Sequence, residues 1–196
     1  MVNKDFYKEY MEIFLEENAK VNLISKNDEK FLWEKHVYDS LGIKYFFDKY
    51  GKGKTLLDIG TGGGFPSVPI ALTYNDIDVT ALDSIAKKIR AVQIFKEKLN
   101  IGNLIPVCSR VENIDGKYDI VISRAVSSLK NICEYALPKL KKGGYFVAYK
   151  SRKTPEEIAD ATIVLNKYDA MIVDIIEYNL PLDENHTRNL IVISKS

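Results

Sequence analysis

The sequence has 196 residues, 28 of them basic and 27 acidic, with a formal net charge of +1. A chain of this length buries enough apolar surface to fold without disulfides or a structural metal, and we expect a single domain over residues 1–196. Because the net charge is close to zero, the sequence excludes a protein that is attracted to nucleic acid by the electrostatic field of the whole molecule. Any RNA binding must therefore use local patches.

The cysteines and the N-terminus bear on the compartment. Cys108 and Cys133 are far apart in sequence, with no CxxC spacing and no nearby histidine pair. This pattern favours a reduced, cytoplasmic protein without a disulfide framework or a metal site. The N-terminal stretch MVNKDFYKEYMEIF is charged every few positions, and no run of about 18 apolar residues occurs, so we expect neither export nor a membrane location.

The apolar pattern changes once along the chain. Residues 1 to about 50 have apolar side chains at helical spacing and predict a helical N-terminal extension. Short apolar runs separated by helix-length segments follow, which is typical of a parallel sheet with helical crossovers. These predicted strands are Thr55–Ile59, Ile77–Leu82, Leu104–Cys108, Asp119–Ile122 and Gly144–Tyr149.

Helix signals and a final strand pair complete the predicted fold. One helix is expected over Ser84–Leu99, and another begins at Pro155 with Thr154 as its N-cap. Ala170–Tyr178 and Asn189–Ser194 predict an antiparallel pair. The predicted fold class is α/β: a Rossmann-like fold with a seven-stranded, mostly parallel sheet, an antiparallel C-terminal hairpin and a helical N-terminal extension.

The strongest local signal is segment 55–66, TLLDIGTGGGFP, in which a strand leads into glycines and a helix start. Such glycines let the backbone approach a ligand and present amides at a positive helix end, although a flexible turn would use them too. The dinucleotide motif GxGxxG needs glycine where Phe65 stands, and no GKS or GKT follows. Asp58 suits a cationic ligand, as the ammonium of S-adenosylmethionine is, better than it suits a pyrophosphate.

Asp83 supplies a second signal. It follows the glycines by about 20 residues, the usual position for a carboxylate that binds ribose hydroxyls. NAD and S-adenosylmethionine sites share this feature, and an N-cap of the following helix would explain the same residue. Together with the glycine loop, the pattern favours a domain that binds S-adenosylmethionine and transfers its methyl group.

The end of the fourth predicted strand, where methyltransferases usually dock their target, reads SRAV at 123–126. Enzymes that methylate exocyclic amines commonly have Asp or Asn-Pro-Pro-Tyr there. Enzymes that methylate a cytosine carbon need a nucleophilic cysteine, and Cys108 and Cys133 lie outside this loop. With these two classes of target eliminated, methylation of a ring nitrogen remains.

The chain resembles the RsmG family, also called glucose-inhibited division protein B, which methylates guanine N7 in 16S ribosomal RNA. The matching segments cover nearly the whole chain: Asn22-Leu23, Trp33-x-x-His36-x-x-Asp39-Ser40-Leu41, Asp58 to Pro66, Leu82-Asp83-Ser84, Arg110-Val111-Glu112, Tyr118-Asp119, Ser123-Arg124-Ala125 and Arg188-Asn189-Leu190. GGFP together with HVYDSL and SRAV is far more specific than the glycine loop alone. Ser67 and Ser151 stand where glycine is expected, which changes the expected geometry of these loops.

The resemblance implies an S-adenosylmethionine-dependent rRNA (guanine-N7) methyltransferase that acts on 16S rRNA within the small ribosomal subunit. The implied cofactor-binding residues are Gly60, Gly62, Phe65, Asp83, Ser84, Val111, Glu112 and Arg124. Within this set, Gly60 and Phe65 would contact the methionine and ribose region, Asp83 the ribose, and Val111 and Glu112 the adenine.

The implied catalytic residues are Arg124, where cofactor and guanine meet, and His36. Other interpretations remain open for both. Arg124 also suits a structural ion pair with Asp119 or Glu112, and His36 suits a packed or surface histidine. Trp33 is expected in the core rather than stacked on a base.

Partners are less well specified by the sequence. Three basic clusters are candidate RNA contacts, and each also suits a solvated face: Lys87-Lys88 with Arg90, Lys139 with Lys141-Lys142, and Lys150 with Arg152-Lys153. We expect a monomer that binds a structured ribosomal particle better than naked RNA. A small-molecule methyltransferase, or a noncatalytic RNA-binding or cofactor-sensing module, also fits, and a nicotinamide oxidoreductase is a more remote alternative.

Overall fold

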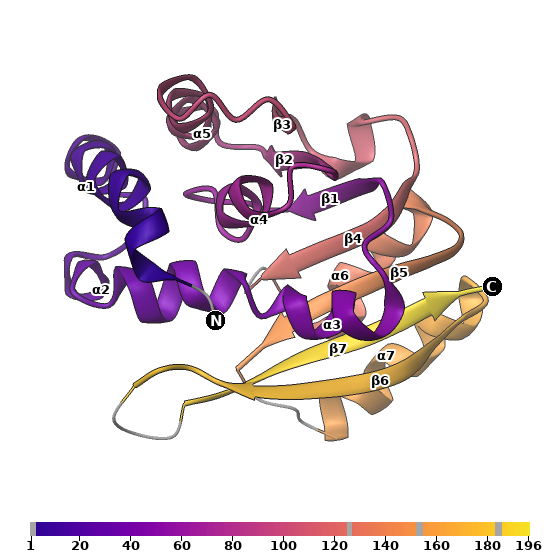
Figure 1. Cartoon of the computed structure of the whole chain (residues 1–196). Coiled ribbons are helices and arrows are strands. Elements are labelled where there is room, and N and C mark those ends of the chain that lie inside the picture. The colour runs from indigo at the N-terminus through magenta and orange to yellow at the C-terminus, as the bar shows by residue number, and fades with distance from the viewer. Residues whose placement is uncertain (1–2, 125–126, 152–154, 183–185) are drawn as a thin grey trace.

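The computed structural model describes residues 3–124, 127–151, 155–182 and 186–196. Seven strands form one sheet in the order β3-β2-β1-β4-β5-β7-β6 (Figure 1). The strands are β1 (Thr55–Ile59), β2 (Asp78–Asp83), β3 (Leu104–Cys108), β4 (Tyr118–Arg124), β5 (Leu140–Lys150), β6 (Ala170–Asn179) and β7 (Thr187–Lys195). β1 to β5 are parallel, and β7 lies antiparallel between β5 and β6. The predicted α/β class with a C-terminal hairpin is confirmed.

The helices begin close to their predicted positions. The N-terminal extension contains η1 (Lys4–Tyr7), α1 (Lys8–Val21), α2 (Lys26–Glu29), the π-helix η2 (Leu32–Tyr38) and α3 (Ile43–Tyr50). The later helices are α4 (Ser67–Thr73), α5 (Ala86–Lys98), η3 (Val111–Asn113), α6 (Leu129–Ala136), η4 (Leu137–Lys139) and α7 (Pro155–Lys167). Pro155 opens α7 as predicted, while its predicted N-cap, Thr154, lies outside the described residues. No helix within these ranges is long and apolar enough to cross a membrane.

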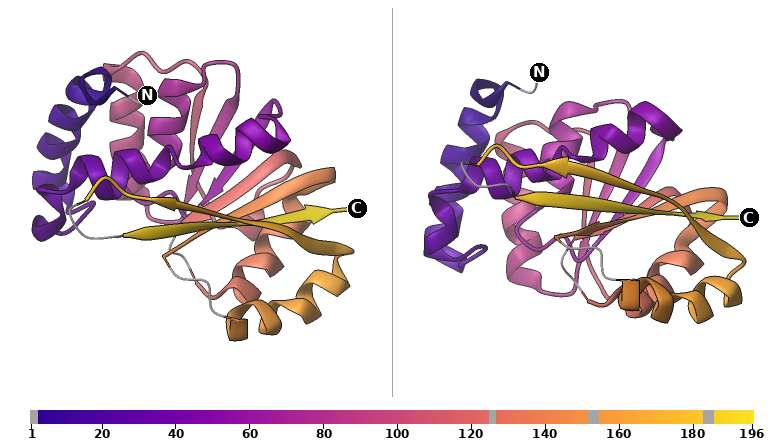
Figure 2. Two further views of the ribbon diagram at one scale, coloured as in Figure 1. Left: turned by 60° about the horizontal axis from the view of Figure 1, so that its bottom comes forward. Right: turned by 90° about the horizontal axis from the view of Figure 1, so that it is seen from below.

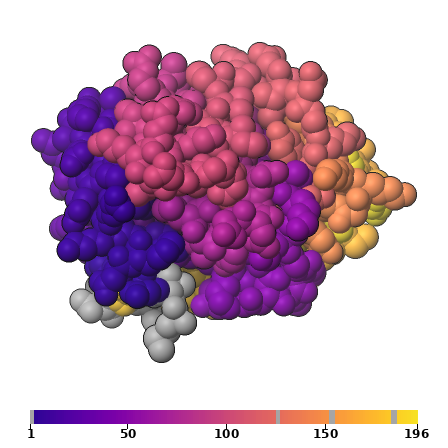
Figure 3. All heavy atoms as spheres, turned by 45° about the horizontal axis from the view of Figure 1, so that its top comes forward, coloured from indigo at the N-terminus to yellow at the C-terminus, as the bar shows by residue number. Residues whose placement is uncertain are grey.

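The two faces of the sheet bury two separate apolar clusters. α6 and α7 cover one face, and α3, α4, α5 and the N-terminal extension cover the other (Figure 2). Trp33 belongs to the cluster beneath the N-terminal extension, which confirms its predicted core position, and is 9% exposed. Figure 3 shows the N-terminal segment packed directly against the segment that carries α5. The extension is therefore part of the core.

Aromatic side chains fix the extension beside the glycine loop. Phe14 of α1 stacks on Phe95 of α5 with ring centroids 5.7 Å apart, and it contacts Phe65 at 5.0 Å. Each large apolar side chain buried in this way contributes roughly 2 kcal/mol. A Cβ at Gly63 would lie 3.1 Å from the Cβ of Leu23, so glycine permits this close approach. The extension thus forms a wall over the carboxyl ends of the parallel strands.

Candidate active site

The loop after β1 takes a backbone course that requires glycine. Gly60, Gly62 and Gly64 have φ angles of +77°, +59° and +91°, in the left-handed region that side chains disfavour. The N–H groups of Gly60 and Thr61 donate to the carbonyl oxygen of Leu82 at 2.8 and 2.9 Å. These bonds hold the loop against the end of β2, where Asp83 lies.

Asp83 connects the glycine loop to the start of α5. Its Oδ2 accepts from the N–H of Gly62 at 3.0 Å, and its Oδ1 accepts from the N–H of Ile85 at 2.9 Å. The second bond explains why α5 begins at Ala86, two residues later than predicted. The N-cap of α5 is Ile85 rather than Asp83, so the helix-cap interpretation of Asp83 was wrong, and the side chain instead holds the backbone before the helix and borders a pocket.

This first pocket, which we call the Asp83 pocket, has a volume of about 880 Å³. It lies at the carboxyl ends of the strands, where open α/β sheets bind ligands, and its volume is typical of small-molecule sites. Its lining includes these predicted cofactor residues: Gly60, Asp83, Ser84, Val111, Glu112 and Arg124. Lys88, predicted as an RNA contact, lines the same pocket with its Nζ 3.9 Å from Asp83 Oδ2.

A second pocket, the His36 pocket, adjoins the first and has a volume of about 680 Å³. The two pockets share Gly60, Arg124 and Ser127. The other two predicted cofactor residues, Gly62 and Phe65, line the His36 pocket. Every predicted site residue therefore borders one of two neighbouring cavities.

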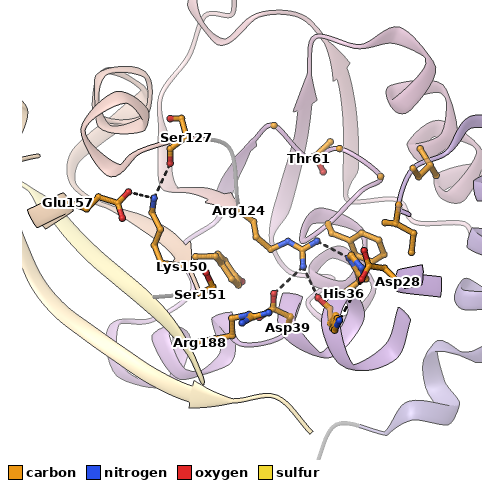
Figure 4. Close-up of a pocket in the computed structure, with 18 residues that line it drawn as sticks. Asp28, His36, Asp39, Thr61, Arg124, Ser127, Lys150, Ser151, Glu157 and Arg188 are labelled. Atoms are coloured by element: carbon orange, nitrogen blue, oxygen red, sulfur yellow. Dashed lines mark hydrogen bonds and ion pairs between the residues drawn. The ribbon is translucent and has the colours of Figure 1, made fainter. Parts of the chain in front are cut away.

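Arg124, at the junction of the pockets, is held by the π-helix η2 (Figure 4). Its Nη1 donates to the carbonyl oxygen of Lys35 at 3.2 Å and to Asp39 Oδ2 at 3.1 Å, and its Nη2 lies 3.3 Å from His36 Nδ1. The guanidinium also lies over the ring of Phe65, 5.4 Å from its centroid. π-helical turns are rare and occur frequently at functional sites. Here the π-helix supplies two acceptors to one guanidinium, and Asp39 directly after it supplies the third.

The expected ion-pair partners of Arg124 were wrong. Asp119 lies at the opposite end of β4, where it accepts from the N–H groups of Lys54 and Thr55 and from Lys141 Nζ. Among the described residues, the carboxylate within ion-pair distance of Arg124 is Asp39 rather than Asp119 or Glu112. The ion pair is real, but it joins β4 to the N-terminal extension.

Asp39 brings three of the sequence motifs together. It is 4% exposed, and its Oδ1 accepts from Tyr178 Oη at 2.7 Å and lies 3.5 Å from Arg188 Nε. A buried carboxylate therefore lies between Arg124 and Arg188. The motifs HVYDSL, SRA and RNL are far apart in the sequence, and no motif includes Tyr178.

His36 is a neutral residue in this environment. Burial, followed by the charge of Arg124, lowers its pKa to about 4. Because a guanidinium can only donate, Nδ1 accepts from Arg124 and Nε2 carries the hydrogen. Nε2 is buried and has no hydrogen-bond partner among the described residues. His36 is accordingly a poor general base near pH 7.

Asp58 supports the glycine loop from within the core and lines neither pocket. It is fully buried, and burial raises its pKa to about 7 although Ser67 Oγ donates to its Oδ2 at 2.7 Å. Asp58 therefore does not face a cationic ligand directly, contrary to the expectation from the sequence. Ser67, in the place of the expected glycine, is also fully buried, and its hydroxyl binds Asp58 while accepting from Thr61 at 3.1 Å.

The remaining basic clusters lie at opposite ends of β5. Lys141 is near its start and Lys150 at its end, so about 30 Å of strand separates them. Lys150 lines the His36 pocket and donates to Glu157 at 2.5 Å, whereas Lys139 in η4 and Lys141 lie at the opposite end of β5. Arg152 and Lys153 lie outside the described residues.

The sheet order, with paired pockets at its carboxyl edge, is that of the Rossmann-like fold found in S-adenosylmethionine-dependent methyltransferases. The same fold occurs in magnesium protoporphyrin IX methyltransferase from Synechocystis PCC 6803, solved with bound S-adenosylmethionine. The two are 16% identical with a TM-score of 0.67, over 98% of this chain and 95% of that one. TYW2 from P. horikoshii is 15% identical with a TM-score of 0.62, over 81% of this chain and 62% of that one.

Sequence relatives specify the family. The family model for rRNA small subunit methyltransferase G matches residues 3–190. The enzyme of that name from Staphylococcus saprophyticus is 36% identical over 194 residues, covering 96% of this chain and 80% of the relative. One from Clostridium botulinum is 35% identical over 193 residues, covering 95% and 80%. The chain belongs to this family and is an rRNA methyltransferase.

Proposed function

We propose that this enzyme methylates N7 of a guanine in 16S rRNA of the small ribosomal subunit, acting as a cytoplasmic, single-domain monomer. The observation that carries the proposal is the junction of the two pockets at Gly60 and Arg124. One cavity suits the adenosine of S-adenosylmethionine, and the adjoining cavity suits a base that has left its stack. The methyl group and its acceptor would meet at the shared wall.

The residues of the Asp83 pocket fit the cofactor. Asp83 is 8% exposed, and each of its oxygens accepts one protein hydrogen bond, which leaves acceptor capacity for ribose hydroxyls. Val111 offers an apolar surface for adenine, with Glu112 and Ser84 beside it. Gly60, Gly62 and Phe65 would then lie along the methionine portion. Bound S-adenosylmethionine supplies an electrophilic methyl group on a positively charged sulfur.

The chemistry at guanine N7 needs no general base. N7 attacks with an in-plane lone pair and loses no proton, so alignment and electrostatics supply most of the catalysis. A bidentate contact of Arg124 to O6 and N7, common in guanine recognition, would block the attacking atom. Arg124 therefore acts through O6 or a phosphate, while His36 and Asp39 act as positioning residues that hold it.

Labelled S-adenosylmethionine tests this proposal. The protein is incubated with small ribosomal subunits from a strain that lacks its own enzyme, and the RNA is digested to nucleosides. We expect label in 7-methylguanosine, and less label on naked 16S rRNA than on subunits. Label in another nucleoside would refute the proposed target atom. Turnover of small molecules alone would favour a small-molecule methyltransferase.

A further inference from the structure

The His36 pocket contains carboxylates that differ in how fully they are engaged. Among its described lining residues these are Asp28, Asp39 and Glu157. Asp39 binds Tyr178 and two arginines. Glu157 Oε1 accepts from the N–H of Leu129 at 2.7 Å and from Lys150 at 2.5 Å. Both of these side chains serve to hold elements together.

Asp28 has a different environment. Its side chain is 38% exposed, and its Oδ1 forms an ion pair with Lys35 Nζ at 3.6 Å, which is longer than a direct hydrogen bond. Its Oδ2 accepts from Ser25 Oγ at 2.7 Å. The hydroxyl of Ser25 lowers the pKa of Asp28, so the side chain is ionised at neutral pH. Both oxygens keep acceptor capacity toward the pocket.

The position of Asp28 suits the far end of a bound base. Asp28 belongs to α2 in the N-terminal extension, whereas Gly60 belongs to the glycine loop at the border with the Asp83 pocket. Leu23 and Ile24 line the same pocket and offer apolar surface to the faces of a ring. A base whose N7 points to the cofactor would direct its opposite edge toward the extension.

That edge distinguishes guanine from adenine. Guanine presents two donors there, N1–H and the N2 amino group, while adenine presents a lone pair at N1 and no amino group at C2. Enzymes that act on flipped bases read this Watson–Crick edge by hydrogen bonds. The two oxygens of a carboxylate accept from both guanine donors and are repelled by the lone pair of adenine.

We propose that Asp28 is a specificity-determining residue that accepts hydrogen bonds from N1–H and the N2 amino group of the target guanine. The assignment rests on the proposed guanine-N7 function and extends it to the choice of base. It gives α2 a role in substrate selection. It also leaves N7 free for attack at the pocket junction.

A mutant cycle with an altered base tests the assignment. Wild type and Asp28→Ala are compared on reconstituted subunits that carry guanosine or inosine, which lacks the N2 amino group, at the methylated position. On guanosine, Asp28→Ala should lower single-turnover kcat/KM roughly 10- to 100-fold, the range for a charged hydrogen bond, without changing S-adenosylmethionine affinity. Inosine should slow wild type but cause little further loss in Asp28→Ala, because the two changes remove one interaction.

Ser25→Ala is the matched control. Ser25 caps α2 and donates to Asp28 Oδ2, so this variant weakens the same local structure but keeps the carboxylate. It should still discriminate guanosine from inosine. Asp28→Asn, which keeps the shape and one acceptor, provides the measurement if Asp28→Ala does not fold. If the losses in kcat/KM from inosine and from Asp28→Ala multiply, the proposed role of Asp28 is overturned but the proposed function is not. If wild type labels no guanine, the proposed function itself is overturned.

Discussion

The two pockets are built in different ways although they share a wall. Lining residues of the Asp83 pocket come from 59–135, mostly from the ends of neighbouring strands and the turns that follow them. Those of the His36 pocket span 23–188 and come mainly from the N-terminal extension, the glycine loop and the ends of β4, β5 and β7, with Glu157 from α7. Backbone course shapes the first pocket, and ion pairs between distant segments shape the second. Substitutions in the two pockets should therefore differ in their effects on rate, cofactor affinity and stability.

Arg124→Ala should have the largest effect because Arg124 belongs to both pockets. We expect the single-turnover rate to fall by about 10²- to 10³-fold, as when a preorganised donor is removed from an active site. The thermal transition should change little, since Asp39 keeps Tyr178 and Arg188 as partners. Arg124→Lys keeps the charge but not the fork of donors, and should recover only part of the rate. Activity near the wild-type value would show that Arg124 is structural.

Asp83→Ala should affect the cofactor side alone. We expect affinity for S-adenosylmethionine, measured by titration calorimetry, to fall by roughly 10- to 100-fold because a charged acceptor is lost. The KM for small subunits should stay unchanged. Asp83→Asn, which retains one carbonyl acceptor, should lie between the two. Unchanged cofactor affinity in Asp83→Ala would reduce Asp83 to a structural contact between the glycine loop and the backbone before α5.

Asp58→Asn should alter stability rather than the properties of either pocket. The pKa of Asp58 is about 7 in the folded state against 3.8 when unperturbed, so the folded state retains a proton that the unfolded state releases. Stability supplied by this proton is present below pH 3.8 and is lost as pH rises to about 7. Between pH 5 and pH 8.5 the unfolding free energy of wild type should therefore fall by roughly 3 kcal/mol relative to that of Asp58→Asn. Urea denaturation at both pH values measures this shift, and a constant difference would contradict the raised pKa.

Local signals in the sequence predicted the parts of the molecule that local geometry controls. The strand bounds agree with prediction within one or two residues for β1, β2 and β3, and the loop at Gly60 and Asp83 was recognised from its spacing. Arg124 was also found, but its partner Asp39 lies 85 residues earlier, and no local pattern specifies such a contact. Proximity in sequence instead suggested Asp119, which the extended β4 strand places at its opposite end. The helical pattern of 32–38 gave no sign of π-helical turns, which together with the next residue, Asp39, direct three acceptors at Arg124.

The pH dependence of the chemical step tests the central claim, that the His36 pocket positions a nucleophile and removes no proton. Single-turnover rates on small subunits, with enzyme and cofactor saturating, isolate this step from binding and release. We predict a nearly flat profile from pH 6 to pH 8. His36→Asn, whose amide oxygen can still accept from Arg124, should lower affinity more than rate and keep the profile flat. A rate that rises about tenfold per pH unit and loses this rise in His36→Asn would reveal a general base and contradict methylation at guanine N7.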